Sequence, residues 1–270
     1  MGTSSSSKGP KGGVSFDPPW LDTAIAALGD APTPLFVTPH DTLALATTNR
    51  FTAARRNLSA YMRNGESASL RKAIGHYIRQ GLGGTTRAAG RMRYVAAVGA
   101  RTFSLFAGSQ SAEQIQFKTK LGTLLSSSHT TDDVISTIVA FVLPTSGSVD
   151  EETCRDSMAE ALSDLLSERS DMDIANLSEE DSWALLEHFV GKAIIRQLIL
   201  DIGQILESDA IDVTTKIQRL EEMDQFVQAT VSESFHKIRS HNANISQGDL
   251  TKIVNDVLEI TFQVFGQDDE

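Results

Sequence analysis

The chain has 270 residues, of which 40% are hydrophobic and 22% charged, so it is long and apolar enough to bury a sizeable core. Its single cysteine, Cys154, excludes an internal disulfide, and it has no apolar run of about 18 residues, which argues against a membrane-spanning segment. The sequence begins without the apolar segment of a secretory signal. We therefore expect a soluble, cytoplasmic protein that does not associate with a membrane.

The net charge of -11 is unevenly distributed along the chain. Residues 1–101 contain 13 Lys and Arg against 5 Asp and Glu, whereas residues 102–270 contain 11 against 30. A basic region of this kind attracts polyanions, and an acidic region repels them. An equally good interpretation is that the two regions form complementary surfaces within one molecule.

The first 48 residues divide into two parts. Residues 1–15 are almost entirely Gly, Ser, Lys and Pro, so we expect a disordered Gly/Ser-rich tail. Within residues 16–48, the stretch DPPWLDTAIAALGD predicts a short helix that Asp17 caps and Gly29 ends. The prolines of APTPLFVTPHDTLALATT then predict an extended linker.

Residues 49–108 are predicted to form a basic helical region. Apolar side chains recur every three or four residues in RFTAARRNLSAYMRN and again in SASLRKAIGHYIRQG. In the second stretch we expect Ser67 or Ser69 to cap the helix and Gly81 to end it. GGTTRAAGRMRYVAAVGARTFSLFAG predicts a further helix that begins at Thr85 or Thr86, and its many small residues indicate close packing against another helix.

Residues 109–270 are predicted to form an acidic helical bundle. Ser111 and Ser148 each stand three residues before a Gln or Glu, which is the spacing of a capping box. TTDDVISTIVAFVLP predicts a capped helix that Pro144 ends. Periodic apolar residues then predict helices at about 150–168, 179–206, 213–240 and 248–265.

The helix at 213–240 carries an apolar stripe that is typical of a seam against one neighbouring helix. Its members are Val213, Ile217, Leu220, Val227, Val231 and Ile238. Signals for β-strands are almost absent from the chain. The predicted fold class is therefore all-α, a multi-helix bundle preceded by the N-terminal tail.

No catalytic or metal-binding motif is recognisable. The six histidines show no zinc-ligand spacing and Cys154 has no base beside it in sequence, so we interpret both residue types as structural. GLGGTTR is glycine-rich but lacks the lysine and the spacing of a phosphate-binding loop, and we interpret it as a turn before a capped helix. We expect a protein that is not an enzyme and that holds no metal and no intrinsic cofactor.

The strongest functional signal inside the predicted helices is a basic block from Arg50 to Arg101, which contains 11 Lys and Arg and a single acid, Glu66. Arginine suits bidentate contacts to phosphate and carboxylate. Three interpretations stay open: a nucleic-acid surface, a docking surface for an acidic protein, and pairing with the acidic half of the same chain. The candidate surface residues are Arg55, Arg56, Arg63, Arg71, Lys72, Arg87, Arg91 and Arg93.

Two stretches of the sequence resemble a known family. MGTSSS followed by GP…GG and PPWLD, and later NRFTAARRNLSAYMRNGESASLRKAIGHYIRQGLGGTTRAAGRM, resemble the QatB family, a component of the four-gene Qat anti-phage system of bacteria. The resemblance is specific over about residues 1–22 and 49–92. The acidic remainder is similar in length and character but supplies no sharp motif.

The resemblance implies a role and a set of partners. QatB-like proteins accompany a QueC-like enzyme (QatC-type), a KAP-type P-loop ATPase (QatA-type) and a TatD-like nuclease (QatD-type). It implies that the QueC-like enzyme uses ATP to activate the carboxylate of a 7-deazaguanine and joins it to a protein amino terminus. The QatB-like chain is then the acceptor, and the 7-deazaguanine is a covalent modification.

The first residues suit this role. Gly2 permits removal of Met1, and an α-amino group with a pKa of about 7.7–8.0 is partly neutral near physiological pH, whereas lysine side chains near 10.4 are protonated. Gly2 lacks a Cβ and can approach a bound acyl group closely. Gly2 is therefore the predicted acceptor, and the residues predicted to be recognised by the partner are Thr3, Ser4, Ser5, Ser6 and Trp20.

Other interpretations stay open. MGTSSS also satisfies the pattern for N-myristoylation, and the stretch could equally be an inert leader or a plain tail. For the whole chain, the alternative function is a nucleic-acid-binding or scaffolding adaptor that uses the Arg-rich block at 50–101.

Overall fold

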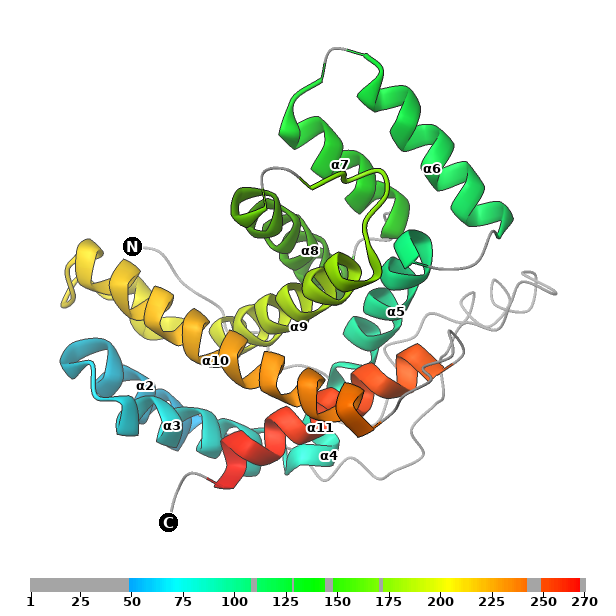
Figure 1. Ribbon diagram of the computed structural model, residues 1–270. Helices are drawn as coiled ribbons and strands as arrows, with labels where there is room; N and C mark the ends of the chain where they lie inside the picture. Colours follow the sequence, from blue (N-terminus) through cyan, green and yellow to red (C-terminus); the bar gives the residue numbers. More distant parts are fainter. Residues whose placement is uncertain are drawn as a thin grey trace, which may run out of the picture. The chain divides into compact units, whose positions relative to one another are not determined.

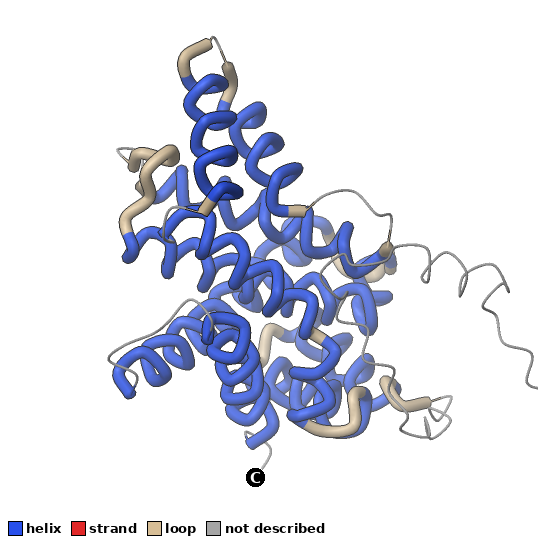
Figure 2. The backbone as a smooth tube through the Cα atoms, turned by 90° about the vertical axis from the view of Figure 1, so that its right-hand side faces the viewer, coloured by secondary structure: helices blue, strands red, loops and turns tan. Residues whose placement is uncertain are grey.

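The computed structural model describes residues 49–107, 111–127, 129–143, 148–169, 172–241 and 249–267. All of them belong to one compact unit, Thr47–Glu270. These residues form helices joined by short connections and include no β-strand (Figures 1 and 2), which confirms the all-α prediction. The tail predicted for residues 1–15 and the helix and linker predicted for residues 16–48 lie outside the described residues.

The helices follow the predicted order. Their bounds are α2 Thr52–Asn64, α3 Ser67–His76, α4 Thr85–Arg91, α5 Arg93–Ala107, α6 Ala112–Leu125, α7 Thr131–Val142, α8 Val149–Glu168, α9 Glu179–Ile202, α10 Val213–His241 and α11 Leu250–Gln267. A π-helical turn, Tyr77–Gly81, extends α3, and a 3₁₀ turn, Gly203–Glu207, extends α9. No helix in the described ranges is both long enough and apolar enough to cross a membrane.

Helix α9 is the central element of the unit because its sequence is apolar on nearly every side. Trp183, Phe189 and Ile194 are among its many buried side chains. The helix packs against α8, α5 and α10 (Figure 1), and these three neighbours cover much of its surface. At the contact with α5, a Cβ on Gly99 would lie 2.6 Å from Leu186 Cδ1. The small residues of α5 therefore allow the close packing that the sequence predicts.

Helices α2 and α3 form a hairpin that packs on α10 and α11 (Figure 1). The connection turns at Gly65, which has a φ of 72° that glycine adopts without strain. Helix α3 begins at Ser67 after Glu66, with no side-chain cap, so the cap predicted at Ser67 or Ser69 is wrong: both serines are already inside the helix. The π-helical turn ends at Gly81, the predicted end of this segment.

The helical signal after the glycine turn belongs to two helices. Helix α4 begins at Thr85, as predicted, but its N-cap is Gly84 and no side chain caps it, so the predicted cap is wrong. Gly83 and Gly84 have φ values of 82° and 106° and bring the chain into α4. A break at the buried residue Met92 then separates α4 from α5.

Most of the acidic half begins its helices with polar caps. The Ser111 and Ser148 hydroxyls accept hydrogen bonds from the backbone N–H of Gln114 and Glu151, at 3.1 and 3.3 Å. Both predicted caps are confirmed. A reciprocal capping box between Thr130 and Asp133, in the first turn, starts α7, where the sequence predicts a capped helix.

Helix α10 differs from the single predicted seam. It packs against α9 and α11 and also contacts α2, so its apolar residues do not form a single seam. Val227 and Val231 are buried, whereas Val213 is 69% exposed and Ile217 52% exposed. The seam prediction is wrong for the first turns of α10, because an apolar stripe does not fix how far a neighbouring helix runs beside it.

Helix α11 closes the unit. Val254, Leu258 and Phe262 are buried along one side of it. The helix packs against α10 and also against α3, α4 and α5, so the last helix of the described chain contacts some of the first.

Candidate functional site

The predicted N-terminal site, Gly2 with Thr3, Ser4, Ser5, Ser6 and Trp20, lies outside the described residues. The structure does place every cation of the predicted basic surface, on α2, α3, α4 and α5. These cations do not form one group, because some are engaged inside the fold and others are not.

Arg55 and Arg91 converge on Asp201 near the end of α9. The Arg91 guanidinium donates to Asp201 Oδ1 at 3.0 Å, and Arg55 donates to the Asp201 backbone carbonyl at 3.1 Å. The Tyr77 hydroxyl donates to Asp201 Oδ2 at 2.8 Å, and Gln197 donates to the same atom at 3.3 Å. Asp201 therefore joins α2, the π-helical turn and α4 to α9.

The hydroxyl of Tyr77 stays protonated in this position. Burial of the ring, followed by the negative charge of Asp201 and the hydrogen bond to it, raises the pKa of Tyr77. The Tyr77 hydroxyl is consequently the donor and Asp201 the acceptor of this hydrogen bond. Two cations of the predicted basic surface, Arg55 and Arg91, thus contribute to the fold.

The remaining cations face outward or make contacts with groups that carry no charge. Arg93 donates to the Gly90 carbonyl at 3.0 Å, and the Arg71 guanidinium lies over the Phe226 ring, 5.7 Å from its centre. Of the cations in the predicted basic surface, four are exposed and have no hydrogen bond or ion pair among the described residues: Arg56, Arg63, Lys72 and Arg87. We name Arg56, Arg63 and Lys72 the hairpin cations, because they lie on the α2–α3 hairpin.

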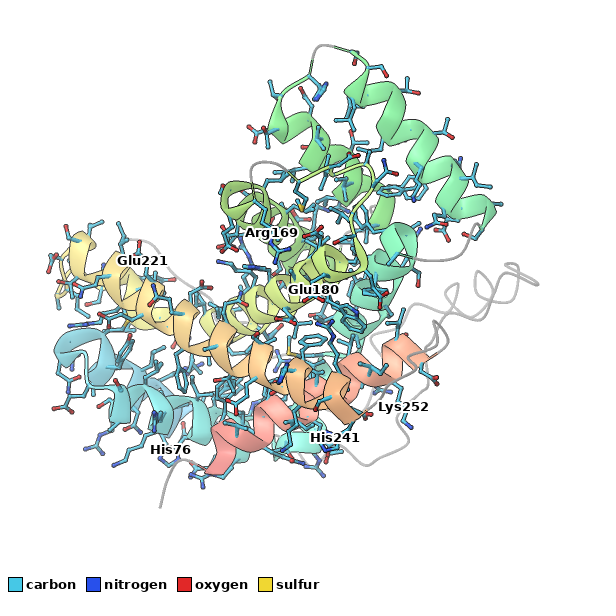
Figure 3. The ribbon with its side chains drawn as sticks, in the orientation of Figure 1. His76, Arg169, Glu180, Glu221, His241 and Lys252 are labelled. Carbon is cyan, nitrogen blue, oxygen red and sulfur yellow. The ribbon has the colours of Figure 1, made fainter. Side chains whose placement is uncertain are left out.

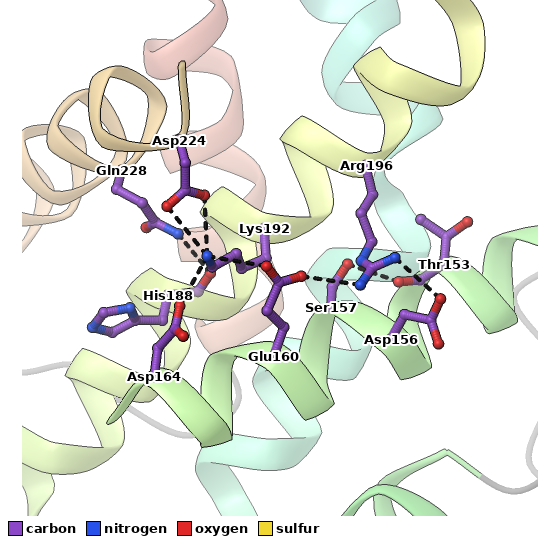
Figure 4. A network of polar contacts seen from close by, with 10 residues as sticks. All are labelled: Thr153, Asp156, Ser157, Glu160, Asp164, His188, Lys192, Arg196, Asp224 and Gln228. Carbon is purple, nitrogen blue, oxygen red and sulfur yellow. Dashed lines mark hydrogen bonds and ion pairs between the residues drawn. The ribbon is translucent and has the colours of Figure 1, made fainter. Parts of the chain in front are cut away.

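A buried lysine stands at the contact of α8, α9 and α10 (Figure 4). Lys192 is only 7% exposed, and its Nζ lies 2.8 Å from Asp164 Oδ2, 3.2 Å from Glu160 Oε1 and 3.1 Å from Asp224 Oδ1. Burial disfavours the charged amine, but the hydrogen bonds and charges of the carboxylates outweigh it and raise the pKa of Lys192. The amine is therefore protonated and is not a nucleophile.

The same set of contacts continues to Arg196, one turn further along α9 (Figure 4). Arg196 lies 3.1 Å from Asp156 and 3.0 Å from Glu160, which also contacts Lys192. Burial raises the pKa of Asp224. The charge of Lys192 lowers it, but this does not offset the burial and the negative charges of Asp164 and Glu160. We name Lys192, Arg196 and their four carboxylates the Lys192 network.

The Lys192 network was not predicted from the sequence, although a signal for it exists. Asp156, Glu160 and Asp164 recur every four residues on α8, and Lys192 and Arg196 have the same spacing on α9. Such spacing places each set on one side of its helix. Nothing in the sequence indicates that these two sides face each other.

Ion pairs also hold the start of α9, where Arg169 and Glu180 lie close together (Figure 3). Asp181 accepts from the Ser178 hydroxyl at 2.5 Å and pairs with Arg169, and Glu180 pairs with Arg239 at 2.8 Å. The hydrogen bond from Ser178, followed by the contact with Arg169, lowers the pKa of Asp181.

The single cysteine is buried in α8. Burial, followed by the negative charges of Asp150 and Glu151, raises the pKa of Cys154 to about 12. A thiol with such a pKa is a poor nucleophile at neutral pH. In the part of the chain that the structure describes, no three His, Cys, Asp or Glu side chains are grouped as metal ligands.

The described surface carries three larger hollows. One lies between the hairpin and α10, has a volume of about 390 Å³ and is lined by Tyr61, Leu70, Arg71 and Phe226 among others. The other two, of about 390 and 340 Å³, lie along α8 and α9 and share Arg196 and Ile199. Arg71 is the one residue of the predicted basic surface that lines any of these three hollows.

Comparison with known proteins yields one finding. A family model described as "Qat anti-phage system associated protein QatB" matches residues 83–265, well over half of the chain. The match begins at the glycine turn before α4 and ends within α11. No curated protein and no solved structure matches the chain.

Proposed function

Because the chain belongs to the QatB family and hence to the Qat anti-phage system, we propose that it is the acceptor protein of that system, modified at its amino terminus by a 7-deazaguanine. The opening sequence MGTSSSS carries the proposal, because removal of Met1 leaves the unhindered α-amine of Gly2 ahead of small polar residues. Thr3, Ser4, Ser5 and Ser6 are the proposed recognition segment, with Trp20 as a further contact. The enzyme partner is the QueC-like protein.

The proposed reaction is an acyl transfer. The deazaguanine carboxylate attacks the α-phosphorus of ATP on the partner, which forms an acyl-adenylate and releases pyrophosphate. The neutral Gly2 nitrogen attacks the acyl carbon, an amide bond forms, AMP leaves and the amine loses a proton. The α-amine suits this step because its pKa of about 7.7–8.0 leaves more neutral amine near pH 7 than a lysine has.

The helical body supports a role as a substrate and docking partner. The buried thiol of Cys154 has a raised pKa, and the amine of Lys192 is held by carboxylates, so these two reactive groups serve the fold. We accordingly propose that the chain is not itself an enzyme and needs no resident cofactor. The KAP-type ATPase and the TatD-like nuclease are the further proposed partners.

Intact mass of the purified chain tests the proposal. The chain is produced together with the other proteins of its system, and in parallel with a QueC-like partner whose ATP site is inactivated. We expect the mass of an acylated, Met-trimmed chain in the first sample only, with fragment ions that place the group on Gly2.

Two variants act as controls. Lys8→Arg removes the nearest side-chain amine and is expected to leave modification intact, whereas Gly2→Pro replaces the primary amine and is expected to prevent it. An unmodified, Met-trimmed mass in the presence of active partners contradicts the proposal, as does full modification of Gly2→Pro. A myristoyl mass at Gly2 would assign the lipidation alternative.

A second candidate function rests on the hairpin cations. Arg56, Arg63 and Lys72 are exposed and unpaired within the described residues, which favours a surface that binds nucleic acid. We expect labelled single-stranded DNA or RNA to bind at low salt and to dissociate as salt rises. The triple variant Arg56→Glu, Arg63→Glu, Lys72→Glu should lower the salt slope by about 2–3, roughly one unit for each lost contact.

The control is a second triple variant, which makes the same change of charge on other helices. Lys118, Lys120 and Lys252, each changed to Glu, lie on α6 and α11 and should leave the salt slope nearly unchanged. Equal losses in both triple variants would mean that overall charge, and not the hairpin, determines binding. Absence of binding at low salt rules this function out.

A further inference from the structure

We infer that a groove along α8, α9 and α10 docks a basic amphipathic helix of a partner protein. The groove consists of the two hollows that share Arg196 and Ile199, with volumes of about 340 and 390 Å³. The hollows lie next to each other, since Arg196 and Ile199 border both, and we name the two together the groove. The inference does not depend on the chemistry proposed at Gly2.

The first end of the groove is apolar and open to solvent. Val149 at the start of α8 is 72% exposed and Leu200 near the end of α9 is 57% exposed, and the partly buried Ile199 belongs to the same lining. Single exposed apolar side chains are common, but a cluster of them in a hollow marks an interaction site. Burial of such side chains against a partner favours binding, because it removes apolar surface from water.

The rim of the groove is acidic. Glu152, Asp156 and Glu160 line it from α8, and Glu221 and Asp224 from α10. The cations in the groove are Lys192 and Arg196, and both are already paired with carboxylates of the Lys192 network (Figure 4). The excess negative charge repels nucleic acids and anionic lipids and attracts Lys and Arg side chains.

The shape and chemistry together select the occupant. A depression between helices that carries exposed apolar side chains at one end accepts a helix whose apolar residues recur at i, i+3, i+4 and i+7. The acidic rim requires Lys or Arg on the flanks of that stripe. A second copy of the chain fits less well, because α2 and α3, which carry the hairpin cations, have no large exposed hydrophobic side chain among their described residues.

A pair of synthetic peptides tests the inference on the full chain. The first is a fluorescein-labelled 18-residue helix with one leucine stripe flanked by lysines, and the second has the same composition with the leucines spread around the helix. We expect the first peptide to bind at least about tenfold more tightly, a difference of about 1.4 kcal/mol, as measured by fluorescence anisotropy.

Substitutions then locate the site. Leu200→Asp should abolish the preference between the peptides even though it adds a negative charge, whereas Ile115→Asp on α6, at a side chain that is 55% exposed, should preserve it. Glu152→Gln with Glu221→Gln should weaken binding and reduce its salt dependence. Circular dichroism verifies that each variant keeps its helix content.

The inference is overturned if the two peptides bind equally, or if Ile115→Asp removes the preference as fully as Leu200→Asp does. Sedimentation of the chain alone gives an independent measurement. Self-association that Leu200→Asp abolishes would assign the groove to a second copy and overturn the partner helix. A monomer at the concentrations of the peptide experiment is the expected result.

Discussion

The α2–α3 hairpin and the Lys192 network both place cations on helices, but the environments of these cations differ. Arg56, Arg63 and Lys72 project from the hairpin without partners among the described residues, whereas Lys192 is buried among carboxylates from α8 and α10. A charge on the hairpin costs the fold little and is available to a ligand. The charge of Lys192 is required by the groups around it.

The largest expected effect comes from removing the buried cation. Lys192→Met leaves Glu160, Asp164 and Asp224 close together without a positive charge, and breaking a buried ion pair in this way costs about 3–5 kcal/mol of unfolding free energy. Urea unfolding at pH 7 measures it. Burial already raises the pKa of Asp224, so the deficit should shrink as the pH falls and the carboxylates become protonated.

Lys72→Met is the matched control for this measurement. It makes the same substitution at an exposed position, and we expect the unfolding free energy to change by less than about 0.5 kcal/mol. Equal effects of the two substitutions would show that the contrast between the hairpin and the Lys192 network is wrong.

An intermediate effect is expected at Asp201, which binds cations of the basic block into the fold. Asp201→Ala removes the ion pair with Arg91 and leaves the buried Tyr77 hydroxyl without its acceptor, at a cost of about 1–3 kcal/mol. Tyr77→Phe removes one bond and leaves Arg91 in place, so it should cost only about 0.5–1.5 kcal/mol. If both variants lose the same stability in thermal or urea unfolding, the contact with Arg91 contributes nothing.

The smallest effect concerns the start of α9 and depends on pH. The pKa of Asp181 is lower in the folded chain than its unfolded value of about 3.9, so the stability it contributes is present above that value and is lost as the pH falls through the folded pKa. Asp181→Asn should cost about 1 kcal/mol at neutral pH. The difference from the wild type should stay constant between about pH 7 and 5 and decline below about pH 4.

Ser178→Ala provides the control, because it removes the same hydrogen bond from the other partner. It should cost about 1 kcal/mol at neutral pH, as the loss of an N-cap serine does. A difference between wild type and Asp181→Asn that persists unchanged to the lowest pH would contradict the lowered pKa of Asp181.

Local signals in the sequence were sufficient to predict most of the helices. The apolar period and the caps at Ser111 and Ser148 involve residues within one turn of each other, and the structure confirms them. The break at Met92 and the exposed start of α10 at Val213 and Ile217 depend on where neighbouring helices end. Such information is not contained in the period of a single helix.

The candidate site shows the same limit. The count of basic residues between Arg50 and Arg101 did not distinguish Arg91, which pairs with Asp201, from Arg56, which has no partner among the described residues. The Lys192 network joins three helices and could not be assembled from spacing alone. The family was predicted from stretches at about 1–22 and 49–92, whereas the family model matches residues 83–265, so the membership is confirmed mainly by a part without a sharp motif.

The position of α11 has a consequence for biosynthesis. A ribosome releases α3, α4 and α5 long before α11, yet these helices bury apolar side chains against it. Until α11 has emerged, those surfaces face water or a chaperone, and the unit reaches its final packing only after that helix is free to fold. A stop codon ahead of Leu250 would therefore leave the earliest helices without their cover and mark the truncated chain for aggregation or proteolysis.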